Sequence, residues 1–304
     1  MLRRALLFLS EQERLKELLL RIPVLRRVAR RFVAGDHLED ALRAARELNR
    51  DGLRVTLDHL GESVEDRATA RRSADAYVES LDAIEEDEAE STISLKLTQL
   101  GLAIDPAFCE ENLRGVLDRA VELDSFVRID MESSDYTGDT LELFESVRPD
   151  YPGHVGAVLQ SYLRRTEDDA RRLADLGAPV RLCKGAYDEP PELAYQDPAE
   201  VDASFVRCLR ILLEGGAPTA VASHDERMVD AALELMDELG LETGDVEFQM
   251  LYGVRRDFQR ELARAGHPVR IYVPYGSEWY PYLMRRMAER PANLQLILRA
   301  LVGG

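Results

Sequence analysis

The stretch PVRIYVPY, residues 268–275, is a short run of apolar and β-branched residues, a pattern typical of a buried strand. It is the last of eight such runs. The other seven are LRVTLDHL (53–60), TISLKLTQL (92–100), FVRIDME (126–132), HVGAVLQSY (154–162), PVRLCKGAY (179–187), PTAVASH (218–224) and DVEFQML (245–251). Eight parallel strands are enough to close a sheet into a barrel, so this last run decides between a closed and an open fold.

Stretches with helical periodicity lie between the runs. Ala70, Ala74, Tyr77, Leu81 and Ile84, for example, recur at intervals of three and four residues. Strands that alternate with helices predict an α/β chain, here a (βα)8 barrel. An open, doubly wound sheet is the competing fold, but neither a GxGxxG nor a GxxxxGK[ST] motif follows any of the runs.

The net charge of the chain limits the classes of partner it can bind. A net charge of −18 argues against nucleic acid, because binding to phosphates depends on Lys and Arg. Only three of the 39 basic residues are lysines. Many acids and few lysines suggest a halophilic composition, a surface adapted to high salt. The three cysteines and five histidines show no metal-ligand spacing, so we expect neither a metal site nor a disulfide framework.

The N-terminal segment is basic, unlike the rest of the chain. Residues 1–31 hold nine basic and three acidic residues, with the apolar runs LLFL and LLLRIPVL among them. This arm either lies on an anionic membrane surface or packs on the domain with its arginines outward. We expect a helical arm at 1–45 and a catalytic barrel at 46–304. Because no run approaches the roughly 18 apolar residues of a membrane span, we expect a cytoplasmic protein, with peripheral contact at the inner face of the cell membrane as the alternative.

Polar residues at the ends of the strand runs point to a site at the carboxyl ends of the strands, where the active sites of such barrels form. Lys96 and Lys184 lie in two of the runs, and Asp130 ends an apolar one. A buried carboxylate needs a partner, and Lys96 on the neighbouring strand is the nearest candidate. The alternatives are a structural ion pair for Lys96 and Asp130, and a Schiff-base role for one of the lysines.

The stretch SEWYPYLMRRMAER, residues 277–290, predicts a helix that begins after Ser277. Tyr282, Arg285, Arg286 and Glu289 share one face of it. Adjacent guanidinium groups repel each other unless an anion binds them, and a carboxylate beside tyrosine rings fits better than a phosphate. The alternative is an exposed helix with Arg285 and Glu289 as an ion pair.

Together these motifs resemble the proline dehydrogenase family. The resemblance covers residues 53–289 and rests on the order and spacing of LDHLGE, SLKLTQLG, RIDME, LQSYLRR, RLCKGAY, ASHD, EFQMLYG, RIYVPYG and YLMRRMAE. The length is similar to that of the short, monofunctional members. The resemblance implies a distorted (βα)8 barrel with N-terminal helices and a final helix over the barrel mouth.

The family resemblance also implies a reaction and a set of residues. The reaction is the FAD-dependent oxidation of L-proline to Δ1-pyrroline-5-carboxylate, with electrons passed to a membrane quinone. The residues matching catalytic positions are Asp130, Arg181 and Lys96. Those matching substrate positions are Lys96, Arg285, Arg286, Tyr272, Tyr282, Leu251 and Ala186, with Glu62 as a gate. Those matching flavin positions are Met131, Gln160, Arg181, Lys184, Gly185, Ala186, Ser223, His224 and Glu289. Cys183 and Ser223 stand where valine and threonine are common in the family.

Two other functions compete with this one. A Schiff-base lyase or aldolase on the same barrel would explain a lysine and a carboxylate only. A barrel that binds a small carboxylate without catalysis would explain only the arginines and tyrosines.

Overall fold

Eight parallel strands close into a barrel in the computed structural model, which describes residues 30–61, 64–280 and 282–284. The strands are β1 (Arg54–His59), β2 (Ser91–Leu95), β3 (Val127–Ile129), β4 (Val155–Gln160), β5 (Val180–Cys183), β6 (Thr219–Ala222), β7 (Val246–Leu251) and β8 (Val269–Tyr275). Each strand pairs with the next along the chain, and β8 pairs with β1 from Arg54 opposite Arg270 to His59 opposite Tyr275. The predicted (βα)8 barrel is therefore confirmed.

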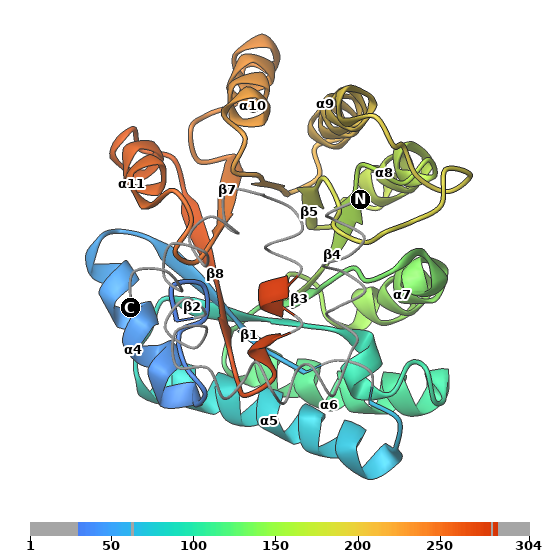
Figure 1. Cartoon of the computed structure of the whole chain (residues 1–304), viewed down its shortest axis with the longest axis vertical. Coiled ribbons are helices and arrows are strands. Elements are labelled where there is room, and N and C mark those ends of the chain that lie inside the picture. The colour runs from blue at the N-terminus through green and yellow to red at the C-terminus, as the bar shows by residue number, and fades with distance from the viewer. Residues whose placement is uncertain (1–29, 62–63, 281, 285–304) are drawn as a thin grey trace, which may run out of the picture.

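Helices form a ring around the strands (Figure 1). They are α4 (Leu38–Arg50), α5 (Arg67–Glu86), α6 (Pro106–Glu122), α7 (Ser134–Val147), α8 (Thr166–Asp175), α9 (Pro198–Glu214), α10 (Glu226–Leu239) and α11 (Arg256–Arg264), with short 3-10 turns η1 (Leu97–Leu100) and η2 (Arg148–Asp150). No helix among the residues described is long and apolar enough to cross a membrane.

Local sequence explains where several helices begin. Asp105 precedes α6, and its carboxylate accepts a hydrogen bond from the backbone N–H of Ala107 at 3.0 Å. Asp197 precedes α9 and accepts one from Ala199 at 2.9 Å. In both cases proline is the first helical residue, where its missing N–H costs no hydrogen bond. These caps fix the point at which the chain leaves each loop.

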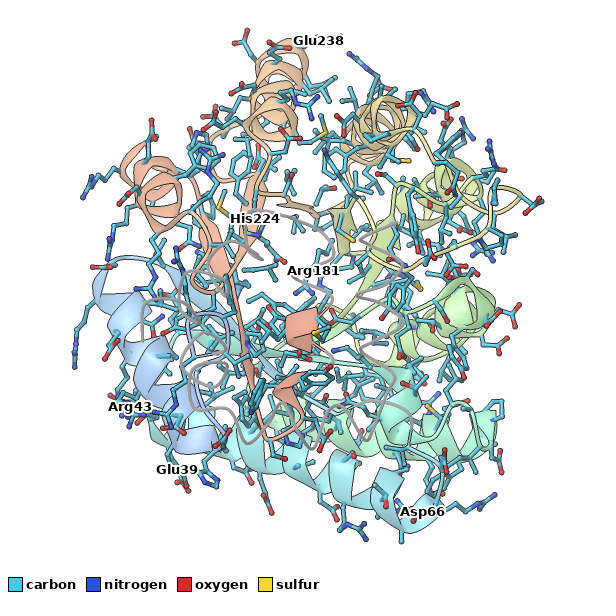
Figure 2. All side chains as sticks on the ribbon, in the orientation of Figure 1. Glu39, Arg43, Asp66, Arg181, His224 and Glu238 are labelled. Atoms are coloured by element: carbon cyan, nitrogen blue, oxygen red, sulfur yellow. The ribbon has the colours of Figure 1, made fainter. Side chains whose placement is uncertain are left out.

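The core lies between the strands and the helices. Each strand contributes an apolar residue that is at most 1% exposed and belongs to one continuous cluster: Leu57, Leu95, Ile129, Leu159, Leu182, Val221, Phe248 and Ile271. Charged side chains dominate the outer surface of the ring, as Glu39, Arg43, Asp66 and Glu238 show, whereas Arg181 lies at its centre (Figure 2).

Six of the eight strands end earlier than the sequence runs suggested, while β7 and β8 end where their runs end. In the second run the chain turns after Leu95 into η1, and Gln99 donates its amide to the carbonyl of His59 instead of extending a strand. In the fifth run β5 ends at Cys183, so Lys184 to Tyr187 form a loop. Apolar residues alone did not show where the strand pairing stops.

The segment after β8 crosses the middle of the barrel in the view of Figure 1. Trp279, Tyr280 and the residues 282–284 are helical and at most 5% exposed. The start of the predicted final helix is therefore present. The division of the chain near residue 45 stays a prediction.

We predict that the buried core residue of β5 contributes strongly to the stability of the fold. Leu182→Ala should lower the free energy of unfolding by about 2–5 kcal/mol, because it leaves a cavity beneath the surrounding helices. Leu193→Ala is the matched control. Its side chain is 46% exposed, so its effect should stay within about 0.5 kcal/mol. Urea unfolding measures both, and equal losses would contradict the assigned core.

Candidate active site

A cavity of about 610 Å³ opens at the carboxyl ends of the strands. The residue that follows each of the eight core residues named above lines it: Asp58, Lys96, Asp130, Gln160, Cys183, Ala222, Gln249 and Tyr272. Successive side chains of a strand point to opposite faces, so residues next to the outward core residues point into the barrel. The strand pleat itself therefore assembles the site.

All predicted site residues that the structure describes line this one cavity. They are Lys96, Asp130, Met131, Gln160, Arg181, Lys184, Gly185, Ala186, Ser223, His224, Leu251, Tyr272 and Tyr282. Glu62, Arg285, Arg286 and Glu289 lie outside the described residues. Their roles stay predictions.

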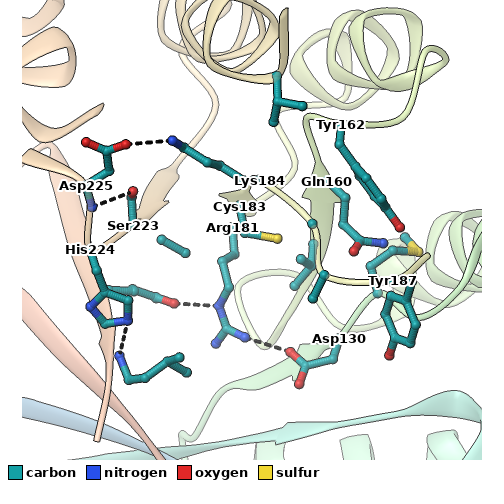
Figure 3. Close-up of a pocket in the computed structure, with 18 of the residues that line it drawn as sticks. Asp130, Gln160, Tyr162, Arg181, Cys183, Lys184, Tyr187, Ser223, His224 and Asp225 are labelled. Atoms are coloured by element: carbon teal, nitrogen blue, oxygen red, sulfur yellow. Dashed lines mark hydrogen bonds and ion pairs between the residues drawn. The ribbon is translucent and has the colours of Figure 1, made fainter. Parts of the chain in front are cut away.

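Arg181 lies at the centre of the site, 6% exposed, and it bonds across the barrel (Figure 3). Its Nη1 donates to Asp130 Oδ1 at 2.6 Å, its Nη2 to Ser94 Oγ at 3.0 Å and its Nε to Gln249 Oε1 at 2.5 Å. Ser94 belongs to β2 and Gln249 to β7, and neither strand pairs with β5. Three of its five N–H groups are therefore used to fix the guanidinium plane.

Asp130 joins three of the predicted residues. Its Oδ1 accepts the bond from Arg181, and its Oδ2 accepts one from the Tyr272 hydroxyl at 2.6 Å. The Lys96 ammonium lies 3.6 Å from the same Oδ2. The predicted pairing of Asp130 with Lys96 is thus present, but the two shorter bonds of Asp130 go to Arg181 and Tyr272.

The closer partner of Lys96 was not predicted from the sequence. Its Nζ donates to Asp58 Oδ1 at 2.8 Å, and Asp58 is fully buried. Burial opposes the charged form of Lys96, but Asp58, Tyr272 and Asp130 outweigh it and raise its pKa well above the usual value. Burial also raises the pKa of Asp58, against the attraction of Lys96. The signal was available, because an acidic residue inside the apolar run LRVTLDHL occupies an inward position.

Lys184 is held by two carboxylates of its own. Its Nζ donates to Asp202 and, at 2.8 Å, to Asp225 Oδ2. The backbone N–H of Asp225 in turn donates to Ser223 Oγ at 3.1 Å (Figure 3). Neither aspartate was a predicted site residue, although Asp225 ends the ASHD motif. Asp202 lies on α9, and the strand pattern gave no indication of it.

The backbone and a neighbouring aromatic ring together require glycine at position 185. Its φ is +107°, and a Cβ there would lie 2.2 Å from the ring of Tyr162. Only glycine fits both the left-handed backbone and the close approach of Tyr162.

His224 contacts the strand that carries Leu251. Its Nε2 accepts a hydrogen bond from the backbone N–H of Leu251 at 3.2 Å, so Nε2 is unprotonated and Nδ1 carries the proton in the neutral ring. This contact ties the end of β6 to the end of β7 at the cavity wall. The ring therefore has a structural role whatever else it binds.

Within the described residues no group of three or more histidines, cysteines, aspartates or glutamates is arranged to hold a metal ion. The expected lack of a metal site stays a prediction.

Comparison with known proteins identifies the family. The proline dehydrogenase family model matches residues 41–298, which is most of the chain. The chain belongs to the proline dehydrogenase family. It is 38% identical over 302 residues to proline dehydrogenase 1 of Bacillus subtilis (strain 168), covering 99% of both chains. It is also 38% identical over 281 residues to proline dehydrogenase of Deinococcus radiodurans, covering 91% of both.

A solved structure agrees with this family. Proline utilization A (PutA) from Bdellovibrio bacteriovorus, inactivated by N-propargylglycine, matches with a TM-score of 0.82 and 28% identity, over 86% of this chain and 32% of that one. The chain thus spans about a third of that protein. Its length is instead that of the separate proline dehydrogenases above. The predicted activity, oxidation of proline to Δ1-pyrroline-5-carboxylate, is confirmed at the level of the family.

Asp58 gives a direct test of the buried network. Asp58→Asn should lower the free energy of unfolding by about 3–5 kcal/mol, because it leaves the Lys96 ammonium without its nearest counter-charge. Asp51→Asn is the matched control. Asp51 pairs with Arg260 at a similar 2.9 Å but is 42% exposed, so the expected loss is under about 1 kcal/mol. Comparable losses in the two variants, measured by urea unfolding, would mean that burial does not set the strength of the Asp58 pair.

Proposed function

We propose that the cavity at the carboxyl end of the barrel binds FAD and L-proline together, and that electrons from proline pass through FAD to a membrane quinone. One observation carries this proposal. Thirteen residues predicted from separate motifs line a single cavity around Arg181. Membership of a flavin-dependent family supports the cofactor.

The residues present fit a flavin. Arg181 and Lys184 bring positive charge to the cavity, which suits a ring that gains negative charge on reduction. Gln160 donates its amide nitrogen to the carbonyl of Glu132 at 2.8 Å, so its own carbonyl oxygen stays available to a ring N–H. Met131 and Val158 offer apolar surface for a flat ring. We propose Met131, Gln160, Arg181, Lys184, Gly185, Ala186, Ser223, His224 and Glu289 as the flavin-binding set.

Proline would bind beside this set. Lys96, with Arg285 and Arg286, would hold its carboxylate, and a bidentate guanidinium suits that group. Four residues that line the same cavity offer apolar walls for the pyrrolidine ring: Tyr272, Tyr282, Leu251 and Ala186. Lys96 fits this role because its raised pKa keeps it an ammonium over the whole neutral range. Glu62 is proposed as a gate beside the arginines.

The reaction removes two electrons and two protons from proline. From the neutral amine, the C5–H bond breaks and its electron pair leaves with the hydrogen as a hydride. The nitrogen lone pair forms the C5–N double bond, and the remaining N–H proton is then released. FAD, when bound, supplies the hydride acceptor. The cavity side chains would hold the pyrrolidine ring and the carboxylate of proline in a fixed position, so that the reacting atoms start in the right geometry.

Asp130 fits a positioning role better than a proton-accepting one. Both of its carboxylate oxygens already accept hydrogen bonds, from Arg181 and from Tyr272. Each oxygen keeps a further lone pair, but a proton on either would remove the negative charge that holds the Arg181 guanidinium and the Tyr272 hydroxyl in place. We therefore propose that Asp130 orients Arg181 and Tyr272, and that the amine loses its proton to water before hydride transfer.

The two lysines do not support the Schiff-base alternative. Such a nucleophile must be a neutral amine. Lys96 lies within 3.6 Å of two carboxylates, and its raised pKa keeps it an ammonium. The Lys184 nitrogen is engaged with Asp202 and Asp225. The family assignment also separates this chain from lyases and from non-catalytic barrels.

The colour of the protein tests the cofactor. We predict that the purified protein is yellow, with the absorbance of oxidised flavin, and that proline bleaches it under anaerobic conditions. Glycine, which carries the carboxylate but no ring, is the control and should leave the absorbance unchanged. A colourless protein that takes up no added FAD would sink this proposal.

The arginine pair tests substrate binding. Arg285→Met and Arg286→Met should each weaken proline binding by about 2–5 kcal/mol, the cost of removing one partner of a buried charge pair. Arg260→Met is a matched control at an arginine 43% exposed on the outer ring. Michaelis constants for proline measure the effect. Values unchanged from the parent in both variants would rule out the clamp while leaving the flavin proposal intact.

A further inference from the structure

A second cavity, of about 390 Å³, lies at the opposite end of the barrel. Its walls come from the amino ends of the strands, through Arg54, Thr92, Arg128, Thr219 and Arg270 among others. Arg181 and Gln249 line both cavities, so this one layer of side chains separates them. The function proposed above uses nothing else at this end.

Arg128 in this second cavity is a buried cation without a counter-ion. Arg128 is only 7% exposed. Its Nη1 donates to two backbone carbonyls, of Ala157 at 3.0 Å and Pro179 at 2.8 Å, and its Nε is buried with no hydrogen-bond partner. No acidic residue forms an ion pair with it in the part of the chain that the structure describes. A buried charge left unpaired in this way is costly.

The acids nearby are engaged elsewhere. Glu247 binds Arg270 through two bonds, of 2.8 and 3.0 Å, and lies 3.5 Å from Arg54. Asp245 is exposed and accepts a hydrogen bond from the backbone of Glu242. The cavity therefore has more positive than negative charge, and the excess is on Arg128.

Arg128 and Arg181 also repel each other. Burial, together with the charge of Arg181, lowers the pKa of Arg128 to about 9. The guanidinium is still charged at neutral pH. An anion beside Arg128 would remove both penalties, because it would neutralise the buried charge and screen Arg181.

We propose that the amino-end cavity binds a small oxyanion, held by Arg128, Arg270 and Thr92. A planar guanidinium suits the oxygens of a tetrahedral or carboxylate anion. Thr92 already accepts a bond from Arg270 at its Oγ1, at 3.2 Å, so its hydroxyl hydrogen is available to donate. The cavity volume is ample for such an ion together with water molecules, which take about 30 Å³ each in the liquid.

Thermal unfolding of the purified protein tests this proposal. Sulfate is titrated while NaCl holds the ionic strength constant. The midpoint should rise and saturate, since a ligand at 100 times its dissociation constant shifts the unfolding equilibrium by about 100-fold. No rise, or a rise that NaCl alone reproduces, overturns the proposal. Phosphate and acetate then define the class: protection by phosphate alone indicates a tetrahedral ion, and protection by acetate as well indicates carboxylates.

Variants separate this site from general salt effects. Arg128→Gln should abolish the sulfate dependence, and Thr92→Val, a near-isosteric change, should weaken it about tenfold through one lost bond to a charged group. Arg260→Gln, on the outer ring, should keep the full response. If Arg128→Gln does not fold, Thr92→Val decides alone. A Thr92→Val response equal to that of the parent protein would overturn the assignment.

Discussion

The bonds of Arg181 across the barrel are the constraint on which the rest of the site depends. Its guanidinium connects β5 to β2, to β7 and to the end of β3, and each of these bonds spans the lumen. The interior of such barrels is usually packed by branched apolar side chains. In this barrel the charged side chain of Arg181 occupies the interior. It therefore needs hydrogen-bond acceptors on other strands, at the same level along the barrel axis.

The two lysines of the site, like Arg181, are each paired with aspartates. Lys96 lies between Asp58 and Asp130, and Lys184 between Asp202 and Asp225. Two carboxylates around one ammonium fix its position, but they also cancel its charge at a distance. Positive charge for an anionic substrate must then come from additional groups. This explains in physical terms why a carboxylate site built on Lys96 would also need an arginine pair.

Much of this was predictable from sequence, because strand periodicity is a local property. The eight runs predicted the barrel, and the polar residues at their ends predicted a site at the carboxyl ends of the strands. Partners brought together by closure were harder to predict. Asp58 meets Lys96 from the neighbouring strand, and Asp202 reaches Lys184 from the following helix. Such pairings depend on register and helix placement, which periodicity does not encode. The need for glycine at position 185 was equally hard to predict, because its contact with Tyr162 arises only from the folded structure.

The single layer formed by Arg181 and Gln249 has a consequence for how the protein can change. The two chambers of the barrel share this partition, and the Arg181 guanidinium lies in it. A substitution that alters the potential at the amino end is felt at the carboxyl end through the same side chain. The two ends of the barrel therefore cannot be altered independently, and evolution or design at one must accommodate the chemistry at the other.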